Sequence, residues 1–398
     1  MDRDRIQEAL EGALQAAPPP DAPPYLLTIL MHEANEGGPR ADGRMVSLLN
    51  VLRAEPELRV FDGMMQIIPG GASRIEYHTL TDWLIRRATT VGIDQSLQDL
   101  QRYIEATELP LELAVALSGL TPGATCDMGR GILFVPWDSL QDSSQKRSVW
   151  ERCVMGAPWF LPTGALVRTV AIEKLHLHQD DFPCYAEQHL APIDQTELYD
   201  ALMCMALVAP CAPHVVGSWV SIPQWAPVYG GGMLLPQLEG IASSQPFPPE
   251  AAHRARDLFE AFCALPANLK ARLRLVMQRL NRAMRRRVTV DASIDLGIAL
   301  EALYLSDTGD DRGELTFRLK TRAARFLGTT EAERQNIFRL VGDLYGMRSS
   351  AVHTGLVSAT IRGRPANEVL ADGFALTADT TRRFIASGEP DWNRVLFA

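Results

Sequence analysis

The sequence predicts an α+β protein, in which a mixed α/β N-terminal region is followed by an all-α helical bundle. Two observations support this fold class. Alternating apolar residues, typical of strands, occur at 131–137 and 166–179. From residue 250 onward, apolar residues recur at helical spacing in successive segments joined by short connections. A chain of 398 residues is long enough for two or three domains.

The N-terminal region opens with a charged helical segment that ends at the proline cluster of residues 17–24. We therefore expect a helix and proline-rich linker over residues 1–24, and a mixed acidic domain over residues 25–245. Within that domain, helical periodicity is found at 25–62 (with a glycine-rich break), 78–106 (hinged at Gly92) and 196–209.

The C-terminal region begins after SSQPFPPE, residues 243–250, whose prolines predict a domain boundary. Its helices are expected at 251–265, 268–286, 290–305, 314–328, 331–353 and 368–386. The fifth of these starts with Thr330 and Glu333, the S/T-x-x-E spacing of a capping box. We expect residues 250–398 to form one helical bundle.

Charge is distributed unevenly between these two regions, although the whole chain has a net charge of −9. Residues 250–398 hold 23 basic and 18 acidic residues, a net charge of +5. The first 249 residues hold 16 basic and 30 acidic residues, a net charge of −14. This asymmetry predicts either two domains with different partners or two opposite surfaces that dock on each other.

The sequence gives no sign of export or membrane insertion. Its first residues lack the apolar core of a secretory signal, and the longest apolar run, 201–210, is about half a membrane span. Six scattered cysteines without a C-x-x-C pair are typical of a reduced, cytoplasmic protein. We therefore expect a cytoplasmic protein with no membrane partner.

No cofactor or metal is expected either. His176 and His178 lie on one side of a predicted strand, with Cys184 and His189 downstream. These spacings match no zinc pattern, and we expect a surface pair of histidines instead. The nucleotide-binding, hydrolase and metalloprotease motifs with known mechanics are also missing from the sequence.

The stretch YGMRSSAVHTG places Arg348 and His353 five positions apart at the end of a helical pattern. At 100° per residue, Arg348 falls on the apolar stripe of its helix, where an unpaired charge is costly. The segment 290–305 offers Glu301 on an apolar stripe, with Asp295 next to that stripe as the alternative acid. We expect Glu301 to be buried and to form a bidentate pair with Arg348.

Two readings of this geometry stay open. In the structural reading, the ion pair pins two helices, Arg322 and Arg325 are competing cations for Glu301, and His353 caps a helix end. In the functional reading, Arg348 binds a phosphate through its forked guanidinium, and a histidine exchanges protons near neutral pH. Such a pair suffices for RNA cleavage without metal: the base assists attack by the 2′-hydroxyl, and the cation stabilises the pentacoordinate phosphorus.

The sequence R-S-S-A-V-H fits the R-x4-6-H motif of HEPN domains, an all-helical family of nucleotide-binding proteins and ribonucleases. Residues 255–385 resemble the ApeA-like HEPN branch, because they contain four segments in the order NRAMRR, SIDLGIALEALYL, FRLKTRAARFLG and LYGMRSSAVHTG. The resemblance implies a homodimer in which two motifs meet at a two-fold axis and form a composite ribonuclease site. Arg348 would be its phosphate cation and His353 its acid/base. Ser349 stands where the family usually has Asn, Asp or His.

The protein is expected to be a metal-independent endoribonuclease effector that cleaves RNA, including tRNA. Its catalytic residues would be Arg348, His353 and Ser349. The N-terminal region is similar to the variable regions of bacterial antiviral defence proteins, and would hold a toxin in check until a foreign trigger binds. The alternative is a catalytically silent HEPN module that dimerises and binds a nucleotide, RNA or protein partner. Candidate RNA-binding residues end the basic helix 271–287: Arg285, Arg286 and Arg287.

Overall fold

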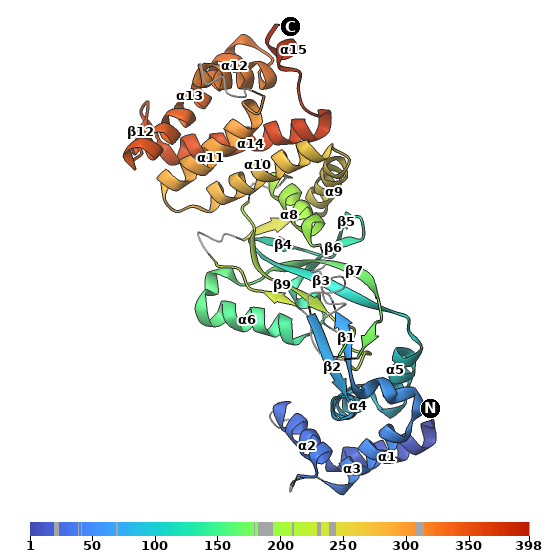
Figure 1. The fold of residues 1–398 in the computed structure, drawn as a ribbon. Coiled ribbons are helices and arrows are strands. Elements are labelled where there is room, and N and C mark those ends of the chain that lie inside the picture. Colours follow the sequence, from blue (N-terminus) through green and yellow to red (C-terminus); the bar gives the residue numbers. More distant parts are fainter. Residues whose placement is uncertain are drawn as a thin grey trace. The chain divides into compact units, whose positions relative to one another are not determined.

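The computed structural model has the predicted α+β fold (Figure 1). The chain divides into two compact units, described separately below. The first unit comprises Met1–Leu113, Thr169–Asp194 and Trp219–Met233, and the second comprises Ala114–Arg168, Gln195–Ser218 and Leu234–Ala398. The structure describes residues 1–19, 24–38, 40, 42–68, 71–178, 180–181, 194–208, 211–228, 232–238, 244–307 and 314–397.

Helices of the first unit confirm the helical segments expected near the N-terminus. On α1, the buried residues Ile6, Leu10 and Ala13 follow the spacing of a packed amphipathic helix. The predicted hinge at Gly92 is also confirmed, because this residue separates two helices with a φ of +88°, a conformation that favours glycine. The helices are α1 (Arg3–Ala16), α2 (Pro24–Glu36), α3 (Gly43–Ala54), α4 (Tyr77–Val91) and α5 (Ile93–Glu105).

The first unit contains a small antiparallel sheet, of which β8 lies in the predicted strand segment 166–179 and the other two strands were not expected from the sequence. Its strand order is β2-β1-β8, and Met65 pairs with Arg74 on one side and with Leu177 on the other. The predicted helical segment 25–62 ends at residue 62, where the first of these strands begins. The elements are η1 (Pro56–Phe61), β1 (Asp62–Ile68), β2 (Gly71–Glu76) and β8 (His176–Leu177).

A buried polar network joins α5 to this sheet. The Tyr103 hydroxyl donates to Gln66 Oε1 at 2.9 Å and shares a 3.0 Å hydrogen bond with His176 Nε2. Burial raises the pKa of Tyr103, whereas burial and the nearby Lys174 ammonium lower the pKa of His176 to about 4. The expectation of a surface histidine pair is therefore wrong for His176, while His178 is exposed. Cys184 and His189 lie outside the described residues.

Both segments predicted from alternation form strands, most of them in a six-stranded sheet, while β8 belongs to the sheet β2-β1-β8. The segment 131–137 is β6, and 166–179 covers most of β7 together with β8; Phe134 of β6 pairs with Leu166 of β7. The alternation in β7 follows from its burial, because residues after Val167 are exposed on every second position. In spatial order the strands are β10 (Met233–Leu234), β9 (His214–Ser221), β3 (Glu108–Ser118), β7 (Gly164–Glu173), β6 (Ile132–Pro136) and β5 (Cys126–Gly129).

The proline-rich stretch 243–250 is part of the second unit, not only a boundary. Its residues form β11 (Gln245–Phe247), which pairs in parallel with β4 (Leu120–Pro122). Phe247 is buried, and its ring packs edge-on against Phe134 with centroids 5.6 Å apart. The second unit is therefore larger than the predicted bundle of residues 250–398.

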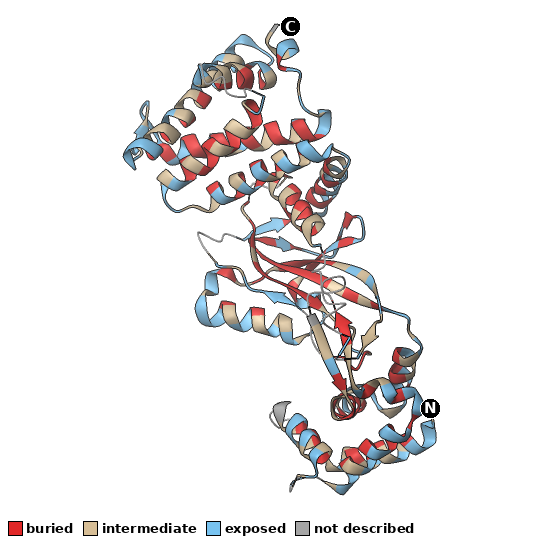
Figure 2. Cartoon of the chain, in the orientation of Figure 1, coloured by how far each residue is buried: buried red, intermediate tan, exposed pale blue. Residues whose placement is uncertain are grey.

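The helices expected after residue 250 are confirmed, and α9 begins at Pro249. Helix α11 packs against α10, α13 and α14, and the inner faces of these helices are buried (Figures 1 and 2). Helix α6 and the last helix were not expected. The elements of the second unit are η2 (Trp137–Ser139), α6 (Ser144–Gly156), η3 (Pro158–Phe160), α8 (Thr196–Val208), α9 (Pro249–Cys263), α10 (Ala267–Arg285), α11 (Thr289–Tyr304), α12 (Leu315–Leu327), α13 (Glu331–Thr354), β12 (Thr360–Ile361), β13 (Arg364–Pro365), α14 (Ala366–Ser387) and α15 (Trp392–Phe397).

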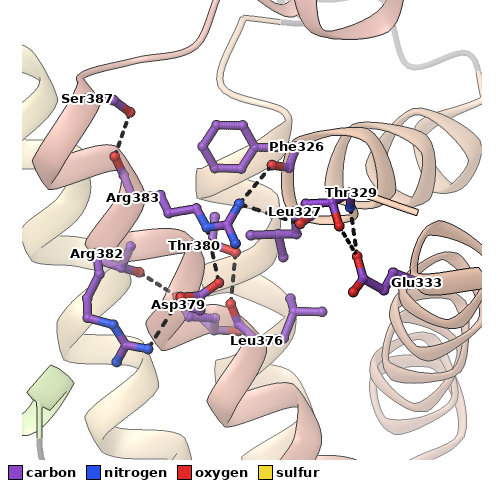
Figure 3. A network of polar contacts seen from close by, with 12 residues as sticks. Phe326, Leu327, Thr329, Glu333, Leu376, Asp379, Thr380, Arg382, Arg383 and Ser387 are labelled. Carbon is purple, nitrogen blue, oxygen red and sulfur yellow. Dashed lines mark hydrogen bonds and ion pairs between the residues drawn. The ribbon is translucent and has the colours of Figure 1, made fainter. Parts of the chain in front are cut away.

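The connection from α12 to α13 is held by polar contacts on both sides (Figure 3). Thr330 and Glu333 form the predicted capping box, and Glu333 Oε2 also accepts from the backbone N–H of Thr329 at 2.8 Å. Hydrogen bonds from Thr329 and Thr330 lower the pKa of Glu333. Arg383 of α14 donates to the carbonyls of Phe326 and Leu327, the last two residues of α12, at 3.3 and 3.5 Å, and it pairs with Asp379. The end of one helix and the start of the next are thus both fixed.

Candidate functional site

Arg348 and His353 lie in the last turns of α13, which runs unbroken through Gly346 to Thr354. The helix ends at Gly355, whose φ of +69° is the left-handed conformation of a glycine C-cap. On an unbroken helix the two residues are about 7.5 Å apart along the axis and about 140° apart around it. They therefore point to different sides of the same helix end.

Arg348 packs directly against α11. A Cβ atom added to Gly297 would lie 2.3 Å from Arg348 Cγ and 2.9 Å from Arg348 Cβ, so glycine is what lets the arginine stem approach this helix. Beyond the stem, Arg348 Nη2 is 3.1 Å from Glu301 Oε1 and 3.3 Å from Glu301 Oε2. The predicted contact between Glu301 and Arg348 is confirmed.

Two details of this pair differ from the expectation. Glu301 is not buried, because its side chain is 29% exposed, and that of Arg348 is 25% exposed. A single nitrogen, Nη2, serves both carboxylate oxygens, so the pair is not the expected bidentate fork. The pairing thus orients the guanidinium of Arg348 and leaves Nη1 for a further acceptor.

The apolar stripe of α11 that carries Glu301 is half-buried, although it was expected to face the core. Ile294 and Ile298 on this stripe are only partly covered. The fully buried residues of α11 lie on its other sides, and they include Leu296, Ala299, Leu300 and Leu303. Partly exposed apolar side chains therefore flank the Glu301–Arg348 pair.

Tyr345 completes the surroundings of the guanidinium and was not identified from the sequence. Arg348 Cζ lies 5.6 Å from the centre of the Tyr345 ring, within the range of a cation–π contact. Burial, followed by the charge of Glu301 and a hydrogen bond with it, raises the pKa of Tyr345. The sequence signal was its i, i+3 spacing to Arg348. Gly297, four residues before Glu301, was missed because a glycine offers no functional group.

His353 and Ser349 are accessible from solvent. His353 is exposed in the last turn of α13. Ser349, next to Arg348, is half-buried. Val352 and Leu356, on either side of His353, are 49% and 71% exposed. The end of α13 thus presents a histidine among exposed apolar side chains.

Asp295, the alternative acid, belongs to a different contact. Its side chain is buried and accepts from Arg279 at 2.8 Å and from Arg286 at 3.3 Å. Arg279 lies in α10 and Arg286 directly follows its last residue, so Asp295 ties α10 and its C-terminal end to α11. The structure therefore does not bring Asp295 to Arg348, and Glu301 is the acid beside the arginine.

The three candidate RNA-binding arginines have different surroundings. Arg286 is half-buried and engaged by Asp295, and Arg285 Nη1 lies 3.3 Å from His214 Nδ1. Arg287 is exposed just after the end of α10. Arg322, a competing cation for Glu301, pairs instead with Asp307 through two nitrogens.

No group of three or more His, Cys, Asp or Glu side chains within the described residues is arranged to hold a metal ion. Among the described helices, none is long and apolar enough to cross a membrane. No protein-family model, curated protein or solved structure matches this chain.

Proposed function

We propose that the second unit is a metal-independent endoribonuclease of the HEPN type. The observation that supports this most is the setting of Arg348. Its stem is held against Gly297 and its Nη2 is held by Glu301, yet a quarter of the side chain remains exposed. Holding an arginine in place without burying it favours phosphate binding, because little side-chain entropy remains to be lost on binding. His353, one and a half turns away, is exposed and supplies a proton-transfer group.

The reaction would use the RNA's own 2′-hydroxyl as nucleophile. His353 accepts the proton of that hydroxyl while the O2′–P bond forms, and Arg348 stabilises the charge on the pentacoordinate phosphorus. The P–O5′ bond then breaks, and the leaving O5′ receives a proton from the His353 of a second copy. The products are a 2′,3′-cyclic phosphate and a 5′-hydroxyl end.

A second copy of the chain is part of this proposal, because one helix presents Arg348 and His353 on different sides. In a two-fold dimer, the ends of two α13 helices would place both pairs along one phosphate path. Exposed Val352 and Leu356 and half-buried Ile298 offer apolar surface for such an interface. RNA, including tRNA, would be the substrate, and the first unit would respond to a foreign trigger in the cytoplasm.

A silent binding module is the second candidate function. It is favoured by Ser349, which departs from the family pattern, and by the Glu301 carboxylate, which offsets part of the Arg348 charge. Such a module would dimerise through the same helix and bind RNA, a nucleotide or a protein without cleaving RNA.

The test is cleavage of single-stranded RNA and tRNA by the purified protein in the presence of EDTA. His353→Ala should reduce the rate about 10²- to 10⁴-fold, the usual contribution of a general acid/base, with an unchanged circular dichroism spectrum. His253→Ala is the matched control, because His253 is an exposed histidine of α9 in the same unit. Equal rates for the two variants would refute the catalytic role of His353, and binding without cleavage by the wild type would favour the silent module.

A further inference from the structure

A second feature of the helical bundle lies at the other end of α13. An open pocket of about 860 Å³ is formed between α12 and the first turns of α13. Its wall combines two aromatic side chains, three arginines and one carboxylate: Phe317, Phe338, Arg325, Arg334, Arg339 and Glu331. This pocket is separate from the Arg348 site, because residues 335 and 348 are about 20 Å apart along the helix axis.

The aromatic part of the pocket is exposed. Phe317 is 56% exposed, and its ring meets that of Phe338 edge-on, with centroids 6.1 Å apart and planes at 78°. The ammonium of Lys320 lies 4.0 Å from the centre of the Phe338 ring and occupies one face of that ring. The free surface of Phe317 is therefore the one suited to stack on a planar ligand.

The charged part of the pocket is positive overall. Arg325 and Arg339 are exposed, and Arg334 is half-buried with its Nε donating to the Gly328 carbonyl at 3.0 Å. Against these three cations stands one acid, Glu331, whose Oε1 accepts from Gln335 Nε2 at 3.1 Å. Three guanidinium groups in one pocket match a phosphate, and the single carboxylate can accept from a hydroxyl or amino group of the same ligand.

The walls of the pocket are fixed in advance of binding. Gly328 allows the close approach of Arg334, because a Cβ atom there would lie 2.7 Å from Arg334 Cγ. The capping box at the start of α13 and the contacts of Arg383 with the end of α12 hold the connection between the two walls (Figure 3). A rigid pocket loses less entropy when a ligand binds.

We propose that this pocket binds one nucleotide, with the base on Phe317 and the phosphate among Arg325, Arg334 and Arg339. Glu331 would accept a hydrogen bond from a ribose hydroxyl or from an amino group of the base. A free nucleotide and a nucleotide within an RNA strand have the same base, ribose and phosphate, so either can be the source. The inference goes beyond the proposed function, because the pocket is a separate site whose lining includes neither Arg348 nor His353.

The experiment measures binding of a short fluorescein-labelled oligoadenylate by fluorescence anisotropy, with AMP as competitor. All proteins also carry His353→Ala, so that the probe stays intact. Phe317→Ala should weaken binding about tenfold or more, whereas Phe317→Tyr, which keeps a ring, should bind like the parent. Because Phe317 is exposed in the first turn of α12, these changes should leave the circular dichroism spectrum unchanged.

Arg325→Ala should also weaken binding and reduce the dependence of affinity on salt, because one phosphate contact is lost. Arg254→Ala is the matched control: Arg254 is exposed on α9, away from the pocket lining, and its loss should change nothing. Displacement of the probe by AMP would identify free nucleotides as sufficient ligands. Displacement by unlabelled oligoadenylate alone would identify the RNA strand as the source.

Three results would overturn the proposal: no binding of oligoadenylate or AMP, equal binding by the parent and Phe317→Ala, or equal losses for Arg325→Ala and Arg254→Ala. In the second case, a change of particle mass in Phe317→Ala would show that Phe317 contacts a second copy instead of a ligand. The outcome is distinguishable from a failure of the ribonuclease proposal, which would appear as absent cleavage in protein that still binds through Phe317.

Discussion

Replacing Gly297 with alanine tests the packing that holds Arg348. The added Cβ would sit 2.3 Å from Arg348 Cγ, about 1.2 Å inside the usual limit of carbon–carbon contact. A different side-chain rotamer moves Cγ but not Arg348 Cβ, which is 2.9 Å from the added atom, so α11 and α13 must separate. Overpacking of this kind costs roughly 1–3 kcal/mol, and the better helix propensity of alanine returns up to about 1 kcal/mol. We expect a net loss of roughly 1–2 kcal/mol.

The assay is urea unfolding followed by circular dichroism, together with the rate of RNA cleavage. Gly346→Ala is the matched control, because Gly346 lies within α13 and an added Cβ there meets nothing within 4 Å. That variant should be more stable than the wild type by about 0.5–1 kcal/mol. Gly297→Ala should also lower the cleavage rate about tenfold or more, since it displaces Arg348, the proposed phosphate-binding cation.

A double variant adds a further check on this packing. In Gly297→Ala/Arg348→Ala, the clashing Cγ is gone, so Gly297→Ala should cost at least about 0.5 kcal/mol less than it does in the wild type. If Gly297→Ala stabilised the protein to the same degree as Gly346→Ala, the close approach of Arg348 to α11 would not exist.

Three further outcomes are expected. Glu301→Gln should lower stability by about 1 kcal/mol and also slow cleavage, because Arg348 loses its charged partner; urea midpoints and rates equal to wild type would count against the pairing. Val352→Glu should convert a dimer to a monomer in light scattering, and an unchanged mass would exclude the end of α13 as the interface. Burial lowers the pKa of His176 to about 4, so the folded state disfavours its protonation. Stability should therefore fall by up to roughly 3 kcal/mol as pH drops from about 6.5 to about 4, and His176→Gln should flatten this part of the profile; an unchanged slope would show that other groups cause it.

The bundle helices were predictable because each buries one face and exposes the other. Buried residues such as Phe259, Leu273 and Leu319 are each followed or preceded by further apolar residues at helical spacing. Strand β3 was missed because its second half, Ala114–Leu117, is buried on both sides and shows no alternation. Helix α6 was missed because exposed apolar residues such as Met155, 86% exposed, blur its periodicity.

At the candidate site, the sequence predicted which side chains meet but not how they are held. The stripes of two helices led to Glu301 and Arg348, because helical geometry fixes where each residue points. The burial of Glu301 was overestimated, since a stripe of apolar residues does not reveal whether another element of the same chain covers that stripe. The pocket at the start of α13 was not predictable, because Phe317 and Arg339 come from different helices and only the tertiary fold brings them together.

The central claim is that the chain cleaves RNA through the 2′-hydroxyl without a metal. It is tested most directly by incubating the protein in EDTA with a single-stranded RNA and with the same sequence methylated at every 2′-oxygen. We expect the unmodified RNA to be cleaved to 2′,3′-cyclic phosphate and 5′-hydroxyl ends, and the methylated strand to stay intact. Cleavage of the methylated strand, or a requirement for magnesium in cleaving the unmodified one, would contradict the mechanism assigned to Arg348 and His353.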